Sequence, residues 1–132
     1  MTQVAVTLGA LLTLAVLTQV VRTRAHPVLD PQRAFTQQQR LAVFARAGNQ
    51  CEHKALFGRR CTTQAAQCDH IYPWSRGGAT AMSNGQALCG PHNNRKSAWV
   101  PTRFYIWRLE RRRCSYFPAG EDVKVRWTNQ PG

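Results

Sequence analysis

Cysteine and histidine side chains with the spacing of metal ligands occupy the middle of the chain. Cys51 and Cys61 come first, and Cys89-Gly90-Pro91-His92 follows at the expected start of a helix. A Cys-x-x-His pair at a helix start presents two ligands about one turn apart, which suits tetrahedral zinc when two more thiolates are supplied. We therefore predict a structural zinc site on Cys51, Cys61, Cys89 and His92.

The spacing of the first pair leaves an alternative open. Nine residues separate Cys51 from Cys61, against about two to four between most paired zinc ligands, so a hairpin around Gly58 is needed. His53 is a rival fourth ligand, because it lies two residues from Cys51. Five cysteines cannot all form disulfides within one chain, and buried or free thiols are the other interpretation.

A second, polar group lies between these cysteines in the sequence. Asp69-His70 begins a stretch typical of a strand and a glycine turn, residues 82–88 return along it, and residues 89–96 begin a helix. Asn84 lies on the returning segment and Asn93 in the helix. An imidazole with a pKa of about 6.5 can take a proton from water near neutral pH, and carboxylate and amide oxygens are hard ligands that suit magnesium or manganese.

Taken together, these residues resemble the HNH endonuclease family, over about residues 39–96. The resemblance implies a ββα-metal fold, in which a hairpin precedes a helix, and metal-dependent hydrolysis of DNA phosphodiester bonds. It implies that His70 is the general base that deprotonates the attacking water, and that Asn84 braces the loop and so orients His70. Asp69 and Asn93 would hold one catalytic Mg²⁺ or Mn²⁺ ion.

The chain departs from the commonest family pattern at one point. That pattern ends in Cys-x-x-Cys-His, whereas this chain has Cys89-x-x-His92-Asn93. The resemblance then implies an HNN-type variant, with His92 on zinc and Asn93 in place of the last histidine. Since adjacent helical residues point about 100° apart, His92 and Asn93 can face different ions. A competing assignment makes His92 the catalytic ligand and leaves zinc with cysteines alone.

The charge of the chain predicts a polyanionic partner. Lys and Arg number 18 against 6 Asp and Glu, which gives a net charge of +12. A field of this sign concentrates polyanions, so we expect DNA, double-stranded or nicked, as partner, and an anionic membrane surface as second candidate. No small-molecule cofactor is expected. The side chains predicted to contact nucleic acid are Arg76, Arg95, Lys96, Arg108, Arg111, Arg112 and Arg113.

The first residues predict a membrane anchor. Residues 4–21 are uncharged and mostly apolar, and as a helix they would span about 27 Å, close to the roughly 30 Å hydrocarbon core of a bilayer. Arg22 and Arg24 follow, so the positive-inside rule places the next domain in the cytoplasm. We expect a transmembrane anchor at residues 1–24; a cleaved signal and a soluble cytoplasmic protein are the alternatives.

The rest of the chain divides into three parts. Residues 25–35 are expected to be a linker, and residues 36–100 the nuclease domain, beginning with a capping box of Thr36 and Gln39 and a helix that ends at Gly48-Asn49. Residues 101–132 are expected to add a basic helix and a strand at residues 123–127. The predicted class is therefore α+β: a small zinc-stapled ββα-metal domain, preceded by a helix and by the transmembrane helix.

A different function fits part of this pattern. A zinc-stabilised nucleic-acid-binding module without catalysis would use the cysteine and histidine cluster and the basic charge. Such a module has no need of Asp69, His70 and Asn93 together, and their presence favours the nuclease.

Overall fold

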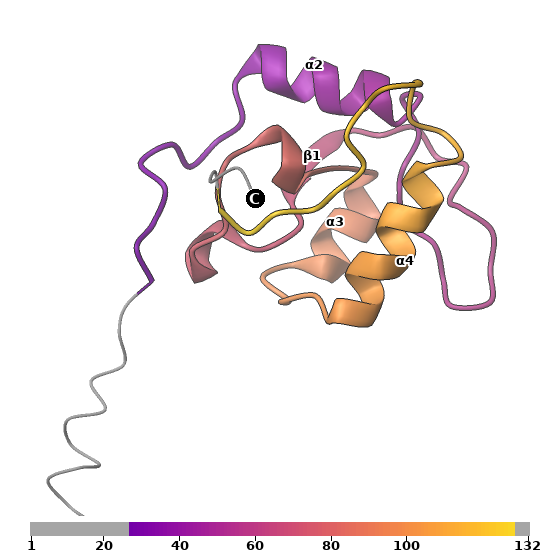
Figure 1. Ribbon diagram of the computed structural model, residues 1–132. Helices are drawn as coiled ribbons and strands as arrows, with labels where there is room; N and C mark the ends of the chain where they lie inside the picture. The colour runs from indigo at the N-terminus through magenta and orange to yellow at the C-terminus, as the bar shows by residue number, and fades with distance from the viewer. Residues whose placement is uncertain (1–26, 129–132) are drawn as a thin grey trace, which may run out of the picture.

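The computed structural model describes residues 27–128. In chain order the elements are α2 (Gln37–Arg46), β1 (Gln67–His70), the 3-10 turns η1 (Trp74–Arg76) and η2 (Met82–Asn84), β2 (Gly85–Leu88), α3 (Gly90–Lys96) and α4 (Arg103–Arg113). β1 and β2 form an antiparallel pair, from Gln67 opposite Leu88 to His70 opposite Gly85. Figure 1 shows the helices around the strand pair, and in the sequence α3 follows directly on β2. The predicted α+β class is confirmed.

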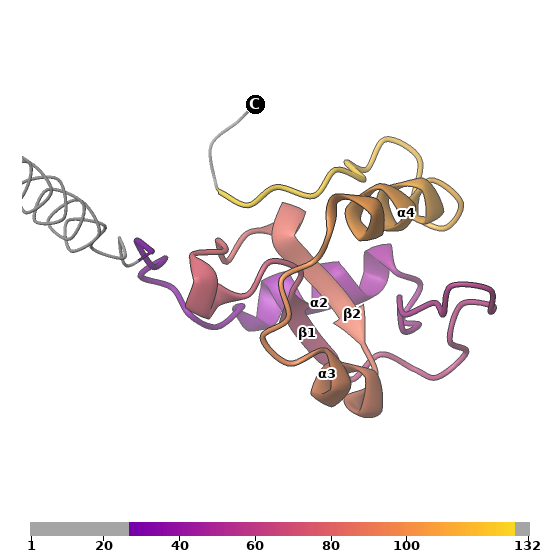
Figure 2. The same cartoon turned by 90° about the horizontal axis from the view of Figure 1, so that it is seen from below.

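Helix α2 covers one face of the strand pair. Its predicted capping box is confirmed: the Thr36 hydroxyl accepts from the amide of Gln39 at 3.2 Å, and the Gln39 side chain accepts from the amide of Thr36 at 2.9 Å. Val43 and Ala47 pack against Ala87 of β2. In Figure 2 the two strands cross in front of this helix.

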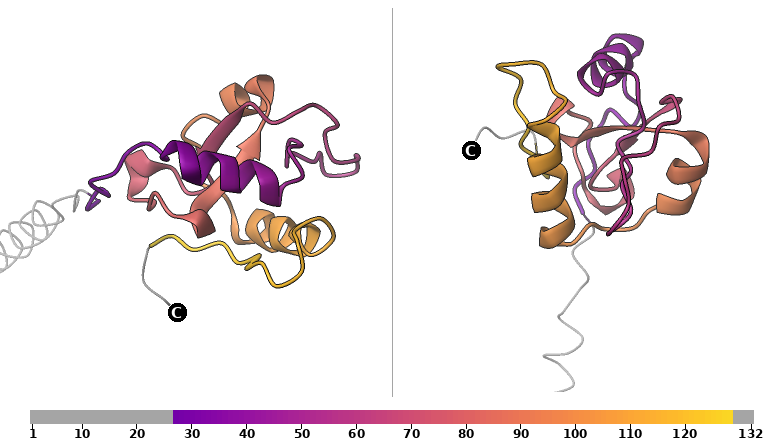
Figure 3. Two further views of the ribbon diagram at one scale, coloured as in Figure 1. Left: turned by 90° about the horizontal axis from the view of Figure 1, so that it is seen from above. Right: turned by 90° about the vertical axis from the view of Figure 1, so that its right-hand side faces the viewer.

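Helix α4 covers the other face. Successive residues of a strand point to opposite sides of a sheet, and Gln86, the neighbour of Ala87, bonds to the hydroxyl of Tyr105 on α4 at 3.1 Å. Ile106 and Leu109 of the same helix pack against Ile71, just beyond β1. All four residues of β2 are buried as a result. Figure 3 shows α2 and α4 from two further sides.

A buried ion pair joins α4 to the chain between α2 and β1. The Arg113 guanidinium donates to both carboxylate oxygens of Glu52, at 2.8 and 3.1 Å, and to the backbone oxygen of Gly85 at 2.8 Å. The hydroxyl of Tyr116 and the amide of Ala87 also donate to this carboxylate. Burial alone would raise the pKa of Glu52, but Arg113 and these hydrogen bonds hold that pKa below its ordinary value.

The same contacts correct one sequence prediction. Arg113 was expected to bind nucleic acid, but its side chain is fully buried and already paired. A guanidinium in this position cannot reach a phosphate, so the prediction for Arg113 is wrong. Its arginine neighbours Arg111 and Arg112 lie on other sides of the helix.

The strand predicted at residues 123–127 is also wrong. The segment is extended, but it joins no sheet within the described residues. Single hydrogen bonds hold it: the amide of Val125 donates to Glu110 at 2.9 Å, and the backbone oxygen of Trp127 accepts from Ala79 at 2.9 Å. Val125 packs against the Ile71 cluster. The alternation of apolar and basic residues in this segment therefore reflects the burial of one side of the chain, and the segment forms no ladder of hydrogen bonds with another strand of the described chain.

The N-terminal predictions have two outcomes. The expected anchor at residues 1–24 lies outside the described residues, and among residues 27–128 no helix is long and apolar enough to cross a membrane. The described end of the expected linker, residues 25–35, packs on the domain: Phe35 is buried, and its ring lies 4.6 Å from the His70 ring between centroids, with the two planes tilted by 38°. That end of the linker is therefore part of the folded unit.

Arg113→Met should destabilise the protein strongly, because it leaves the Glu52 carboxylate buried without its cation. Removing one partner of a buried ion pair costs about 3–5 kcal/mol, measured as the free energy of unfolding in urea. Arg111→Met is the matched control: it removes the same charge from the same helix, but from an exposed position, and should change stability by less than about 0.5 kcal/mol. Equal losses in the two variants would contradict a special role of the ion pair.

Candidate functional site

Three cysteines and one histidine converge at the start of α3. One ligand atom from each of Cys51, Cys61, Cys89 and His92 lies within 4.8 Å of the other three. The Nδ1 atom of His92 is 3.5 Å from Cys51 Sγ and 3.1 Å from Cys89 Sγ. Ligands about 2.0–2.3 Å from a tetrahedral zinc ion lie about 3.5–3.8 Å from one another, so this group suits zinc in both donor type and size.

Local structure brings the distant pair of cysteines together. Residues 50–64 fold back on themselves, with bridges between Gln50 and Gln64 and between Lys54 and Arg60. The amide of Cys61 donates to the backbone oxygen of His53 at 2.8 Å. The predicted hairpin is therefore present. It sets Cys51 and Cys61 opposite Cys89, the residue that caps α3.

The alternative ligand His53 lies beside this cluster. Its ring stacks on the ring of His92, with centroids 3.8 Å apart and planes 18° apart. The structure therefore groups Cys61 with the other ligands and uses His53 to pack against His92. Burial raises the pKa of the Cys51 thiol to about 11, so a thiolate there needs a positive ion beside it, which zinc would supply.

A separate site lies at the end of β1. Asp69 and His70 both line a cavity of about 200 Å³, together with Trp74 from η1 and Ser97 from the end of α3. Ser97 has a φ of 46°, a left-handed conformation that is uncommon outside glycine. The chain thus turns sharply where α3 ends, beside the two residues predicted to act on water and metal.

Hydrogen bonds fix the tautomer of His70. Its Nε2 atom is 2.9 Å from the hydroxyl oxygen of Thr80, and that hydroxyl donates its own proton to the backbone oxygen of Gln32. Because the hydroxyl has only one proton, Nε2 must be the donor in the first bond. Nδ1 then carries the free lone pair. Burial lowers the pKa of His70, so the ring is neutral at pH 7.

The Asp69 carboxylate faces a cation from α3. The Lys96 ammonium is 2.7 Å from Asp69 Oδ2 and donates to the backbone oxygen of His70 at 2.6 Å. The Lys96 side chain is only 8% exposed, so in this arrangement it binds Asp69 rather than an external phosphate. Asn93 lies three residues earlier on the same helix, and residues with this spacing are neighbours on a helix surface.

Asn84 holds the loop between the strands closed. Its carbonyl oxygen accepts from the amide of Tyr72 at 2.8 Å, and its amide group donates to the backbone oxygens of Tyr72 and Ala79 at 3.0 and 2.8 Å. The loop is tight enough that a Cβ at Gly78 would collide with the Tyr72 carbonyl. These contacts fix the chain on both sides of the segment that includes Thr80.

A family model covers the part of the chain that holds the strand pair, α3 and the ligand cluster. Residues 50–98 match the family model of the HNH endonucleases. No curated protein and no solved structure matches the chain. The HNH domain includes the Cys/His cluster, Asp69, His70, Asn84 and Asn93, whereas α2 and α4 lie outside the matched residues. The predicted family resemblance is confirmed.

Sequence reasoning missed the residues that orient His70 in this HNH domain. Thr80 provides the hydroxyl, and Asp30 and Gln32, from the segment expected to be a linker, hold it through the Thr80 amide and hydroxyl. Nearly 50 residues separate these segments in the chain. No local spacing connects them, and Thr80 looks like one more polar residue of a glycine-rich loop.

The predicted nucleic-acid contacts of the HNH domain and α4 differ in how accessible they are. Arg76, Arg95 and Arg111 are exposed. Arg108 donates to the backbone oxygen of Leu56 at 2.9 Å, and Arg112 is half-buried. The exposed arginines are therefore available to a phosphate in this structure, and Arg113 and Lys96 are held inside.

Cys89→Ser should release zinc and destabilise the domain, because Cys89 joins the hairpin ligands to the start of α3. Elemental analysis of the purified protein should find about one zinc per chain in the wild type and a clear loss in the variant. Cys114→Ser is the matched control, since Cys114 is exposed and stands outside the cluster. A wild-type protein that carries no zinc when purified without chelators would contradict the assignment.

Proposed function

We propose that this protein is an endonuclease that hydrolyses DNA phosphodiester bonds, with His70 as general base and a divalent cation on Asp69 and Asn93. The observation that carries the proposal is the placement of His70: Thr80 holds its Nε2 atom as a donor, which leaves Nδ1 as the ring's acceptor, and His70 lines the same cavity as Asp69. An imidazole held in one tautomer next to a carboxylate is the arrangement that general-base catalysis on water needs.

The oxygen atoms at Asp69 suit a hard cation. The Asp69 carboxylate already attracts a positive group, the Lys96 ammonium, which also contacts the backbone oxygen of His70. Asp69 and the Asn93 amide would hold Mg²⁺ or Mn²⁺, for which oxygen ligands are preferred. Such an ion would supply a Lewis acid for the charge that develops on the scissile phosphate.

Side chains of the protein would carry out proton transfer and phosphate binding. His70 Nδ1 would take the proton from water, and Thr80 would keep the ring from turning. Lys96, once displaced from Asp69, would remain close enough to neutralise charge on the bound strand. Exposed arginines, Arg76, Arg95 and Arg111, would bind backbone phosphates and add a salt-dependent part to the affinity.

One observation favours a second candidate, a zinc-stabilised DNA-binding domain without catalysis. Lys96 pairs with Asp69 at 2.7 Å, and an ammonium in that place competes with a metal ion. In such a domain this ion pair would be purely structural. The two candidates predict the same binding of DNA and differ in whether His70 matters for cleavage.

His70→Ala should abolish nicking of supercoiled plasmid, by about 10²–10⁴-fold, because it removes the base while leaving the phosphate contacts in place. The assay uses Mg²⁺ and Mn²⁺ separately, with DNA affinity and thermal stability measured in parallel. Cys114→Ser is the control, because Cys114 is exposed and belongs neither to the Cys/His cluster nor to the lining of the Asp69 cavity. Equal nicking by the wild type and the His70 variant would favour the non-catalytic candidate.

Thr80→Val should slow cleavage by about 10–100-fold, a loss typical when the hydrogen-bond partner that orients a functional histidine is removed. Valine has nearly the same shape but cannot accept the Nε2 proton, so the His70 ring loses its fixed tautomer. Thr80→Ser keeps the hydroxyl and should keep most of the rate. If the serine variant is as slow as the valine variant while both stay folded, the hydroxyl is not what orients His70.

A further inference from the structure

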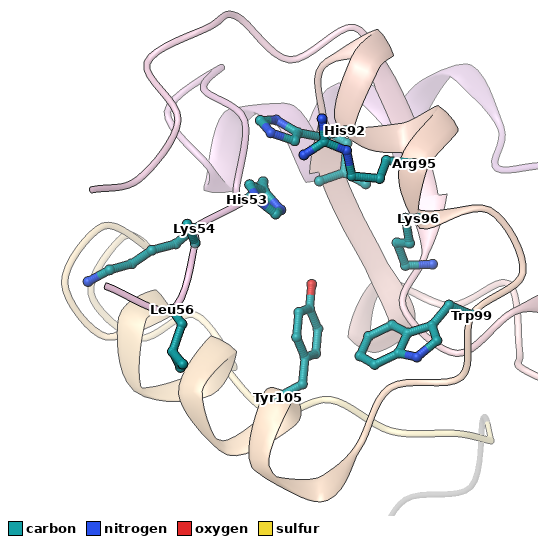
Figure 4. A pocket seen from close by; sticks show the side chains of 10 residues that line it. His53, Lys54, Leu56, His92, Arg95, Lys96, Trp99 and Tyr105 are labelled. Carbon is teal, nitrogen blue, oxygen red and sulfur yellow. The ribbon is translucent and has the colours of Figure 1, made fainter. Parts of the chain in front are cut away.

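A second cavity lies on the other side of Lys96 from the Asp69 site. It has a volume of about 330 Å³ and is bounded by α3, α4 and residues 53–56 of the hairpin (Figure 4). Small-molecule sites in proteins have volumes of about 300–1,000 Å³, so this cavity has room for one nucleoside-sized group and not for a duplex.

Aromatic rings form one wall of the cavity. Trp99 and Tyr105 meet edge to face, with ring centroids 5.3 Å apart and planes 85° apart. Trp99 is 47% exposed and Leu56 is 55% exposed, which are large apolar surfaces to leave in water. In Figure 4 the Tyr105 ring rises from α4 with its hydroxyl toward the middle of the cavity, and the Trp99 ring lies beside it.

The aromatic wall is already fixed in place. The Tyr105 hydroxyl exchanges hydrogen bonds with the fully buried Gln86 side chain, at 3.1 and 3.4 Å. The turn at Ser97, with its φ of 46°, brings Trp99 back toward α4. A preorganised surface of this kind loses little conformational entropy when a ligand binds.

The charge around the cavity selects an anionic ligand. Lys54 and Arg95 lie at its edge, and among the described residues that line it none is acidic. A flat apolar surface beside basic side chains matches a nucleotide, whose base can stack on an aromatic ring while its phosphate meets a cation.

The cavity borders the proposed catalytic site. Lys96 lines its wall while the Lys96 ammonium reaches Asp69 Oδ2 at 2.7 Å. A strand whose phosphate lies at Asp69 would therefore carry a neighbouring nucleotide past the opening of the cavity.

We propose that this cavity binds one unstacked nucleobase of the DNA strand, next to the phosphate at the Asp69 site. This inference rests on the proposed function for its position relative to the cut, but binding of the base itself needs no catalysis. It assigns the protein a preference for single-stranded or locally opened DNA, because a base inside a duplex cannot enter the cavity.

The test compares two oligonucleotides on the whole 132-residue chain, purified without chelators and measured without magnesium or manganese. One is fluorescein-labelled oligothymidylate of ten nucleotides, and the other has the same backbone with abasic sites in place of the bases. Stacking of one base on an aromatic side chain contributes an amount that corresponds to about 5–140-fold in affinity. The wild type should prefer the thymine strand by that factor, measured by fluorescence anisotropy.

Trp99→Ala should lower affinity for the thymine strand by the same factor and leave the abasic strand unaffected, and Trp99→Phe should restore most of it. Trp107→Ala is the matched control, because Trp107 is 51% exposed on α4 and does not line the cavity. Equal affinity for the two strands, or equal losses at Trp99 and Trp107 with both variants folded, would overturn the proposal.

The outcome is independent of the nuclease assignment. Base-selective binding without any cleavage would leave this cavity in place and remove the proposed function. Cleavage without base selectivity would leave the proposed nuclease function in place and remove the proposed base-binding cavity.

Discussion

Everything at the candidate site depends on the convergence of three thiols and one imidazole at the first turn of α3. A helix of seven residues, Gly90–Lys96, is too short to be stable in isolation, since helices below about 12–15 residues are marginal in water. Its start is fixed to the hairpin through Cys89 and His92, and its other end then presents Lys96 to Asp69. A metal ion bound to this cluster would hold the helix that carries the polar site.

The buried Glu52–Arg113 pair gives the hairpin a second anchor, independent of any metal. Glu52 follows Cys51 directly, so the carboxylate that receives Arg113 and the thiol of the cluster lie on opposite sides of the same short stretch. The pair also bonds to the backbone of β2 at Gly85 and Ala87. Small domains bury too little apolar surface to be very stable, and these polar anchors compensate for a modest core.

The parts of the fold that could be predicted are those with local signals. The capping box at Thr36, the paired strands around the glycine turn and the four cluster residues each follow from spacing within a few residues, or from one motif at a helix start. Arg113 was misjudged because a run of three arginines suggests a solvated surface. Helix periodicity could have predicted that Arg113 is buried, because Arg113 comes four residues after Leu109 and seven after Ile106, and both of these are buried on the same side of the helix. The Thr80 contacts with Asp30 and Gln32 join segments that no sequence pattern relates.

Because Thr80 bonds to Asp30 and Gln32, the residues needed to fix the His70 ring extend beyond the residues that match the family model. The backbone carbonyl that receives the Thr80 proton belongs to Gln32, eighteen residues before the match begins at residue 50. A fragment trimmed to residues 50–98 would keep every ligand atom of the cluster and still leave the imidazole free to flip. Domain boundaries taken from the family match alone would therefore remove the Gln32 carbonyl, and with it the hydrogen bond that makes Nε2 the donor and Nδ1 the acceptor of the His70 ring.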